Sequence, residues 1–168
     1  MVIIVFGLPG SGKSYFALEL AGMISADYIN SDRLRKEMFH ERSYSDAEKA
    51  MVYNAMLQKT QEAITQNRNV VLDGTFYKSK IRKLFVRGIA EKTSIFFIEV
   101  IADENIIRQR LKKERPDSEA DFEVYKSIRR HWEPLSMSHL TLESTNSNVD
   151  TMLQKAVQYL KNDKGPDQ

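Results

Sequence analysis

The segment from Gly7 to Ser14, GLPGSGKS, constrains the fold more than any other part of the chain. It fits the pattern G-x-x-x-x-G-K-[ST]. The run Met1 to Phe6 before it is apolar, rich in Val and Ile and followed by glycine, which is typical of a strand buried on both faces. Lys13 to Ser25 then carries apolar residues at helical spacing. The sequence therefore predicts a strand, a glycine-rich loop and a helix in immediate succession.

A loop of this kind between a strand and a helix is suited to binding phosphate. Glycines let backbone amides approach phosphate oxygens closely, and the helix N-terminus adds partial positive charge. We expect Lys13 to bridge the β- and γ-phosphates of a nucleotide and the Ser14 hydroxyl to bind Mg²⁺. The alternative is a glycine-rich turn that binds no nucleotide. The predicted ATP-binding residues of this region are Gly7, Pro9, Gly10, Ser11, Gly12, Lys13, Ser14 and Tyr15.

The rest of the chain alternates between short strands and helices. Further strands are predicted near Tyr28 to Ile29, Asn69 to Asp73, Ser94 to Ala102 and His139 to Glu143. The predicted helix starts are a cap at Ser31, the capping-box pair Ser45 and Glu48, Lys80, a cap at Asp103, the pair Ser118 and Asp121, and a cap at Asn148. Strands separated by helices predict an α/β fold with a parallel sheet and helices on both faces.

Length and composition agree with one compact domain. The chain has 168 residues, of which 42% are hydrophobic and 29% charged, as in ordinary single domains. No apolar run approaches the ~20 residues that cross a bilayer, and there is no cysteine for a disulfide or a thiolate metal site. The N-terminus lacks the features of a secretory signal, so we expect a cytoplasmic protein. The net charge of +2 neither requires nor excludes a polyanionic partner.

Asp73 ends the third predicted strand. In folds with this kind of loop, an aspartate at such a strand end holds Mg²⁺ directly or through a water. We therefore expect Asp73 and Ser14 to share the metal. The alternative is that Asp73 caps the following turn, because Asp before Gly is a common turn dipeptide.

A phosphate-binding loop alone is compatible with GTPases, motors, large ATPase modules and small kinases. GTPases need a guanine-reading N-K-x-D segment, and the chain has none in that order. Ring-forming ATPases usually carry a further helical domain, for which 168 residues leave little room. The remaining interpretation is a small kinase.

With these segments the chain resembles the small P-loop kinases of the polynucleotide-kinase-like group. The resemblance rests on GLPGSGKS at 7–14, NSDRLR at 30–35 and VVLDGTF at 70–76. It implies a three-layer P-loop NTPase sandwich, a five-stranded parallel sheet in the order 2-3-1-4-5, a short lid, and ATP and Mg²⁺ as cofactors. In that group the aspartate after the second strand is the general base for the acceptor hydroxyl, and an arginine three residues later binds acceptor phosphate. Asp32 and Arg35 match these positions.

Both positions also have a plainer explanation. Aspartate is a favoured N-cap residue, so Asp32 can cap the helix that begins near Arg33. Arginines are common on exposed helix faces, so Arg35 can be solvated instead of binding phosphate.

The basic segment Arg108 to Arg115, RQRLKKER, resembles the lid of these kinases. There an early arginine lies against the adenine and a later one clamps the transferring phosphate, which implies Arg110 and Arg115. Glu114 occupies the place that the family spacing gives to the later arginine, so either an insertion shifts Arg115 or Arg108 is the earlier partner. A solvated basic helix end is the alternative. The resemblance gives a kinase domain over 1–162 with a lid at about 108–118, and 163–168 as a polar tail.

Residues around and beyond Asp73 are predicted to contact the acceptor. Arg35, Asp73, Thr75 and Tyr77 are the candidates. The helix that follows is basic through Lys78, Lys80, Arg82, Lys83 and Arg87. A solvated face is the first interpretation of this helix, and nucleic-acid contact is the second.

We therefore expect an ATP-dependent phosphotransferase with an alcohol as acceptor. Lys13, Asp32 and Arg115 are the predicted catalytic residues. A polynucleotide 5′-hydroxyl is the first candidate acceptor, because it fits the basic lid, Arg35 and the basic helix after Asp73. A sugar, nucleoside or antibiotic is the second and needs only a pocket at Asp32. The third hypothesis is a nucleotide-responsive module that hydrolyses ATP slowly and signals by lid closure.

Overall fold

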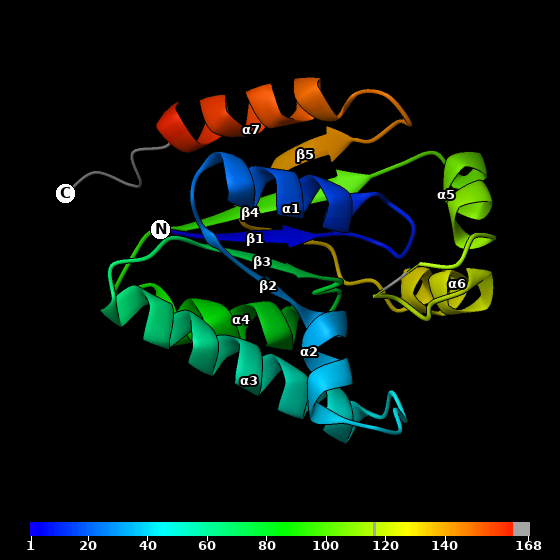
Figure 1. The fold of residues 1–168 in the computed structure, drawn as a ribbon, viewed down its shortest axis with the longest axis horizontal. Helices are drawn as coiled ribbons and strands as arrows, with labels where there is room; N and C mark the ends of the chain where they lie inside the picture. The colour runs from blue at the N-terminus through cyan, green and yellow to red at the C-terminus, as the bar shows by residue number, and fades with distance from the viewer. Residues whose placement is uncertain (116, 163–168) are drawn as a thin grey trace.

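The computed structural model describes residues 1–115 and 117–162. They form a parallel sheet in the order β2-β3-β1-β4-β5, with helices on both faces (Figure 1). The strands are β1 (Val2–Phe6), β2 (Asp27–Asn30), β3 (Val70–Gly74), β4 (Ile95–Ile101) and β5 (Leu140–Glu143). The expected α/β class, the five strands and their order are confirmed.

The helices complete a three-layer sandwich. One face of the sheet is covered by α1 (Lys13–Met23) and α7 (Val149–Asn162), and the other by α3 (Asp46–Thr65) and α4 (Ser79–Ile89) (Figure 1). The short helix α2 (Ser31–Met38) follows β2, while α5 (Glu104–Leu111) and α6 (Phe122–Arg130) lie beyond the carboxyl ends of the strands. Within the described part of the chain, no helix is both long and apolar enough to cross a bilayer.

The central strand β1 divides the core into two halves. All of its residues are fully buried, because helices cover both faces of the sheet. Ile4 and Phe6 pack in the cluster that contains α3 and α4, and Ile3 and Val5 in the cluster that contains α1 and α7. The apolar run in the sequence is therefore continuous because both of its faces need apolar contacts.

The register of the sheet brings the polar segments to one edge. Asn30 of β2 and Val5 of β1 are both paired with Asp73 of β3, so the three side chains share the face that α1 covers. The glycine-rich loop leaves β1 directly after Phe6. The carboxyl ends of parallel strands are where ligands bind in open α/β sheets.

Most helix starts follow the predicted caps. Ser45 and Asp103 cap α3 and α5, each through its side-chain oxygen, which accepts a backbone N–H of the first turn at 3.2 and 2.8 Å. The predicted cap of α6 is wrong by one turn. Asp121 accepts the Val124 N–H at 2.9 Å and is the N-cap residue, whereas Ser118 lies in the preceding segment.

The predicted cap of α2 is also wrong. Asn30 caps this helix: its Oδ1 accepts the Arg33 N–H at 2.9 Å, and Ser31 is the first helical residue. An N-cap residue typically has extended backbone, and Asn30 has it because β2 pairs with β3 up to this residue.

Part of the predicted lid and all of the predicted tail lie outside the described residues. Residues 112–115 and 117–121 link α5 to α6 without helix, and Pro116 lies outside the described residues. The last helix continues to Asn162, and all of the predicted polar tail, 163–168, lies outside them as well.

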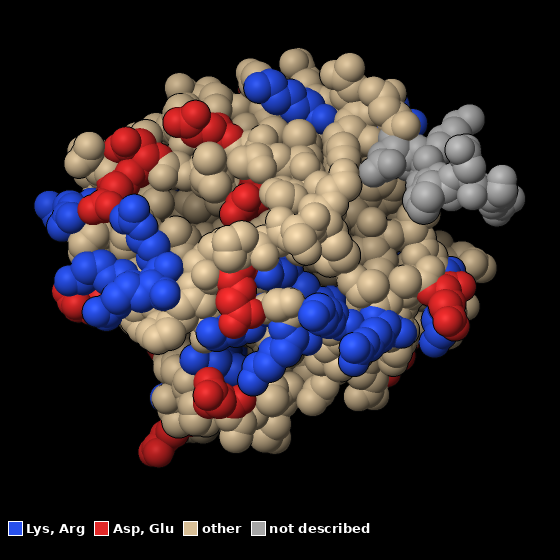
Figure 2. Space-filling model, turned by 180° about the vertical axis from the view of Figure 1, so that it is seen from behind, with Lys and Arg blue, Asp and Glu red and all other residues tan. Residues whose placement is uncertain are grey.

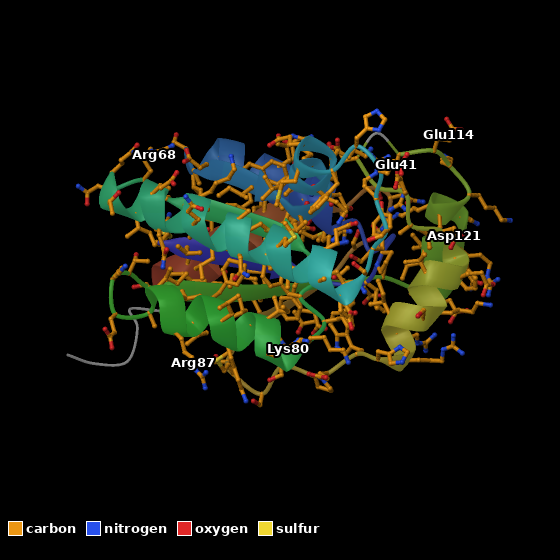
Figure 3. All side chains as sticks on the ribbon, turned by 90° about the horizontal axis from the view of Figure 1, so that it is seen from below. Glu41, Arg68, Lys80, Arg87, Glu114 and Asp121 are labelled. Carbon is orange, nitrogen blue, oxygen red and sulfur yellow. The ribbon has the colours of Figure 1, made fainter. Side chains whose placement is uncertain are left out.

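The basic residues of α4 form an exposed stripe. Lys80, Lys83 and Arg87 are exposed, and none has an ion-pair partner among the described residues. Lys and Arg side chains gather in a band over this helix (Figure 2), and Lys80 and Arg87 point away from the core (Figure 3). Lys78, just before the helix, pairs with Glu133 at 3.1 Å.

Arg82 lies on the opposite side of α4 and is only 2% exposed. The expectation of a solvated face is therefore wrong for this residue. Its Nη1 donates to the Phe76 carbonyl at 2.7 Å and its Nη2 to the Glu133 carbonyl at 2.6 Å. Arg82 thus ties the segment after β3 to the segment after α6.

We expect Arg82→Met to lower the free energy of unfolding by about 2 to 4 kcal/mol, because it leaves buried carbonyls without donors. Lys83→Met on the same helix is the control and should stay within about 0.5 kcal/mol of the wild type. Urea unfolding of the three proteins measures both values. Equal effects of the two substitutions would contradict the structural role of Arg82.

Candidate active site

The loop between β1 and α1 presents backbone amides to a ligand. Gly10 and Gly12 have φ of 78° and 90°, in the left-handed region that favours glycine. Gly12 is the N-cap residue of α1, and no side chain in the described structure caps this helix. A Cβ on Gly12 would lie 2.6 Å from Ser144 Oγ. Backbone N–H groups at a helix N-terminus and the helix dipole favour anions, so this loop is suited to binding phosphate.

Lys13, Asp32 and Asp73 form the charged centre of the site. Lys13 Nζ donates to the Leu8 carbonyl at 3.4 Å, so the side chain folds back over the loop. Burial lowers the pKa of Lys13, and the carboxylates of Asp73 and Asp32 oppose this shift. Burial likewise raises the pKa of Asp32, against the opposing effect of Lys13. The charges are therefore partly desolvated and face one another.

Asp73 is fully buried, and its two oxygens have different surroundings. Oδ2 accepts hydrogen bonds from Tyr28 Oη at 2.6 Å and from Asn30 Nδ2 at 2.5 Å. Oδ1 has no hydrogen-bond partner among the described residues. Asp73 therefore does not cap the turn that follows β3.

The residues at this point fit Mg²⁺ bound together with a nucleotide. The unpartnered Asp73 Oδ1 and the exposed Ser14 side chain belong to residues that line one cavity. Residues 1–115 and 117–162 contain no cluster of three or more His, Cys, Asp or Glu that could hold a metal. Mg²⁺ commonly takes one or two protein oxygens and completes its shell with phosphate and water.

A cavity of about 720 Å³ lies along the outer side of the loop. Arg110 is held at its edge, donating to the Gly10 carbonyl at 3.2 Å and to the Thr145 carbonyl at 2.8 Å. Arg115 also lines this cavity and donates to the Ala120 carbonyl. The predicted nucleotide-side residues that line it are Gly10, Gly12, Lys13, Ser14, Tyr15, Arg110 and Arg115.

Three predicted ATP-binding residues have other surroundings. Gly7 and Ser11 line a separate cavity of about 370 Å³ behind the loop, where the Ser11 hydroxyl is buried. Pro9 lines the second cavity described below. The side chains of Ser11 and Pro9 are thus not directed at the large cavity.

A second cavity, of about 300 Å³, lies between β3, α2, α3 and α6. All four predicted acceptor-binding residues line it: Arg35, Asp73, Thr75 and Tyr77. Lys13, Ser14 and Asp32 line this cavity and the large one. The two cavities therefore meet at the lysine and serine of the loop and at Asp32.

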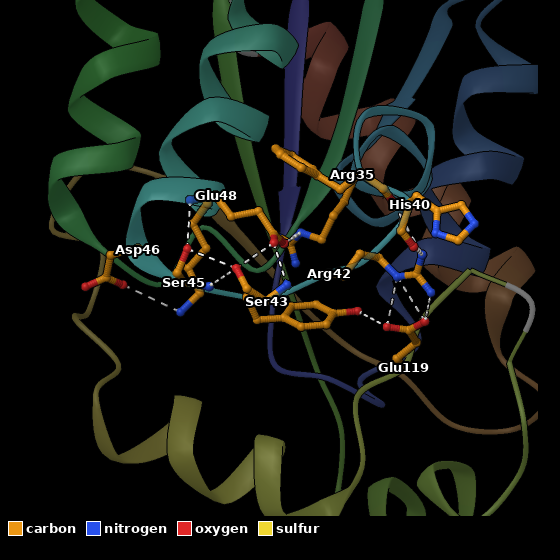
Figure 4. A network of polar contacts seen from close by, with 11 residues as sticks. Arg35, His40, Arg42, Ser43, Ser45, Asp46, Glu48 and Glu119 are labelled. Atoms are coloured by element: carbon orange, nitrogen blue, oxygen red, sulfur yellow. Dashed lines mark hydrogen bonds and ion pairs between the residues drawn. The ribbon is translucent and has the colours of Figure 1, made fainter.

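Arg35 is fixed in the wall of the second cavity and is 6% exposed, which excludes a solvated helix face. Its Nε lies 3.1 Å from Glu48 Oε1, and its guanidinium lies over the ring of Tyr44 at 4.6 Å from the ring centre (Figure 4). Glu48 is held in turn by the Ser43 N–H at 2.6 Å. The ion pair and the aromatic ring keep a buried cation at the cavity.

A second polar network, centred on Glu119, lies in the wall of this cavity, and Figure 4 shows its contacts. Arg42 donates to the Glu119 carboxylate from Nε at 3.1 Å and from Nη2 at 2.5 Å, and the Tyr44 hydroxyl donates to it as well. The hydrogen bonds from Arg42 and Tyr44 lower the pKa of Glu119 to about 2. Glu119 and Tyr44 both line the cavity, so the network ties the segment before α6 to the loop after α2.

Comparison with protein families gives one match over most of the chain. A family model described as an AAA domain matches residues 2–135. The chain belongs to this family. A search of the curated proteins finds no match.

Solved structures with the fold of this AAA domain include small kinases. A sugar kinase from Janibacter sp. HTCC2649 has a TM-score of 0.75 at 14% identity, over 95% of this chain and 94% of that chain. The Mycobacterium tuberculosis APS kinase in complex with AMPPNP and APS has 0.72 at 17%, over 95% and 96%. Shikimate kinase from Acinetobacter baumannii in complex with shikimate has 0.65 at 15%, over 98% and 95%. These similarities show a P-loop kinase-like fold.

Several residues around the cavities of this AAA domain are absent from the predictions. Tyr28 and Asn30 hold Asp73, and Tyr44 and Glu119 are joined by a hydrogen bond in the wall of the second cavity. Their contacts join distant parts of the chain, so no spacing in the sequence signals them. Glu48 has a signal in the capping box, but its carboxylate reaches Ser43 and Arg35 rather than the Ser45 N–H.

We expect Asp32→Asn to leave the fold as stable as the wild type or more stable at neutral pH. A carboxyl whose pKa is raised in the folded chain binds its proton more readily there, so its ionised form opposes folding above that pKa. The destabilising effect of the ionised Asp32 carboxylate disappears as the pH falls through the raised pKa. The difference between the two proteins should therefore shrink in mildly acidic buffer, as measured by urea unfolding. A variant that is clearly less stable than the wild type at neutral pH would contradict the burial effect.

Proposed function

We propose that the protein transfers the γ-phosphate of ATP to a hydroxyl group of a second substrate. The observation that carries this proposal is the meeting of the two cavities at Lys13, Ser14 and Asp32. A hydrolase needs one substrate cavity and access for water, whereas a transferase needs a donor and an acceptor that face each other across the reacting phosphate. The kinase-like fold supports the same reaction class.

The large cavity is the proposed donor site. The loop amides and Lys13 would bind the β- and γ-phosphates there, and Mg²⁺ would be held by Ser14, which lines both cavities, and by Asp73, which lines the second one. When bound, the metal neutralises charge on the phosphate oxygens. Arg110 and Arg115 are the lid arginines of a domain over 1–162 whose lid spans about 108–118. Arg115 affects the pKa of Lys13 as a neighbouring positive charge, which supports a place near the transferring phosphate.

The second cavity is the proposed acceptor site. The acceptor oxygen attacks the γ-phosphorus, the bond from that phosphorus to the β–γ bridging oxygen breaks, and ADP leaves with the electron pair. The hydroxyl proton passes to the carboxylate of Asp32. Arg35, Thr75 and Tyr77 bind the remainder of the acceptor, and the fixed guanidinium of Arg35 favours an acceptor with a carboxylate or phosphate.

A small molecule is the favoured acceptor. About 300 Å³ is at the lower end of cavities that enclose small ligands. The contacts of Glu119 with Arg42 and Tyr44 further restrict the opening. Sugars, other polyols and small hydroxy acids are small enough to fit in this cavity.

A polynucleotide 5′-hydroxyl is the second candidate, and the basic stripe on α4 favours it. Lys80, Lys83 and Arg87 are exposed and unpaired among the described residues, and α4 begins two residues after Tyr77 in the acceptor cavity. A strand whose end enters the cavity could follow this helix. Such an acceptor loses affinity steeply as salt rises, whereas a neutral small alcohol does not.

We expect labelled γ-phosphate to pass from ATP to at least one member of a panel of sugars, hydroxy acids, nucleosides, aminoglycosides and 5′-hydroxyl oligonucleotides. Asp32→Asn should lower transfer by about 10² to 10⁴-fold, because the proton loses its acceptor. Lys13→Ala should lower it by at least about 10²-fold, because charge on the transferring phosphate is no longer neutralised. Lys83→Ala, on the exposed face of α4, is the control and should retain transfer to small acceptors.

The panel distinguishes the candidates. Transfer to oligonucleotides alone, weakened by Lys83→Ala and by salt, would replace the small acceptor by a nucleic-acid end. ATP hydrolysis without any acceptor, unaffected by Asp32→Asn, would overturn the phosphotransferase in favour of a nucleotide-responsive module.

A further inference from the structure

Two polar side chains of β2 hold one oxygen of the buried Asp73 carboxylate. The Tyr28 hydroxyl and the Asn30 amide both donate to Oδ2, and the same amide lies 3.2 Å from the Tyr28 oxygen, to which it also donates. Every donor in this triangle therefore has an acceptor. The second carboxylate oxygen, Oδ1, is buried without a hydrogen-bond partner among the described residues.

This asymmetry is unusual for a carboxylate with a purely structural role. Buried polar atoms are almost always hydrogen-bonded, because an unpaired one costs the free energy of its desolvation. Here β2 saturates one oxygen of Asp73, and the other has no partner in a residue that lines the same cavity as Lys13 and Ser14. The free oxygen is therefore the one available to a ligand of this cavity.

Asn30 has a further hydrogen bond at the other end of its amide. Its Oδ1 accepts the Arg33 N–H at 2.9 Å and so caps α2, the helix that carries Asp32 and Arg35. The reversed amide would direct its oxygen at a carboxylate and its NH₂ at an N–H, so only one orientation satisfies both partners. One side chain thus links Asp73 of β3 to the first turn of α2.

We propose that Tyr28 and Asn30 are positioning residues for the metal and the base. By occupying Oδ2 they leave Oδ1 of Asp73 as the oxygen that would bind Mg²⁺, and through its cap on α2 Asn30 also fixes Asp73 relative to Asp32. This inference rests on the proposed function, which assigns the metal to Asp73 and the base to Asp32. Partners that orient a metal-binding carboxylate typically change metal affinity by about 10- to 100-fold.

Two substitutions separate this role from folding. Tyr28→Phe removes a single hydroxyl and keeps the ring. Asn30→Ser keeps a hydroxyl that can cap α2 but is too short to reach Asp73. Asp103→Ser is the matched control, because it also replaces one N-cap residue by another, on α5, and Asp103 lines none of the three cavities described above.

The experiment titrates the full chain with Mg²⁺ at a fixed concentration of fluorescent ADP and measures ADP affinity separately in EDTA. We expect Tyr28→Phe and Asn30→Ser each to raise the half-saturating Mg²⁺ concentration by about 10- to 100-fold and to change the ADP affinity in EDTA far less, although both residues also line the large cavity. The double variant should show less than the product of the two effects, because both act on one oxygen. Asp103→Ser should match the wild type.

The outcomes separate this inference from the proposed function. Unchanged Mg²⁺ dependence in both variants of β2, beside a wild type that responds to Mg²⁺, overturns the positioning role and leaves the phosphotransferase standing. Equal losses of affinity with and without Mg²⁺ also overturn it, because a merely structural role acts on both. A shifted Mg²⁺ dependence in a chain that phosphorylates no acceptor supports the positioning role and counts against the function. If Asn30→Ser does not fold, Tyr28→Phe decides alone.

Discussion

Compensation of one fully buried carboxylate is the constraint on which the site depends. An ionised carboxylate without exposed surface is costly unless hydrogen bonds and opposite charge surround it. Asp73 receives its hydrogen bonds from β2 and its opposite charge from Lys13. Its hydrogen-bond donors reach it only when Asn30 stands opposite Asp73 in the ladder between β2 and β3. The order and the register of these strands are therefore requirements of the site as well as of the core.

The second cavity also has a buried charge in its wall, and this charge is positive. Arg35 is a buried cation, and it is compensated by Glu48 and by the face of Tyr44. Glu48 sits in the first turn of α3, so this compensation also holds α2 against α3. The outer network differs, because the Glu119 side chain is 40% exposed. Water therefore weakens its ion pair with Arg42. The inner wall is thus held by a buried ion pair, and the outer wall by a partly exposed one.

Local signals predicted the strand, loop and helix around Lys13 correctly, because every determinant there lies within a few residues. Other features depend on pairing between distant segments. Ser31 and Asn30 are both good N-cap residues, and only the extent of β2 against β3 decides between them. Arg82 shares the inner side of α4 with the buried Phe85 and Ile89, but its partner is the Glu133 carbonyl, 51 residues away, and no local spacing indicates that contact. The contact of Tyr28 with Asp73 spans 45 residues, so spacing alone could not reveal it.

The two arginines beside the large cavity donate hydrogen bonds to uncharged groups and have no carboxylate hydrogen-bond partner among the described residues. Arg110 and Arg115 donate to neutral carbonyls, and burial lowers the pKa of both guanidinium groups. The guanidinium groups are cations, so exchanging a neutral carbonyl for a negatively charged phosphate adds the attraction of opposite charges, and a nucleotide phosphate can replace these carbonyls favourably. The donors to Asp73 have no such alternative, because their acceptor is already charged. We therefore expect nucleotide binding to rearrange the contacts of Arg110 and Arg115, while the hydrogen bonds to Asp73 at the edge of the sheet persist.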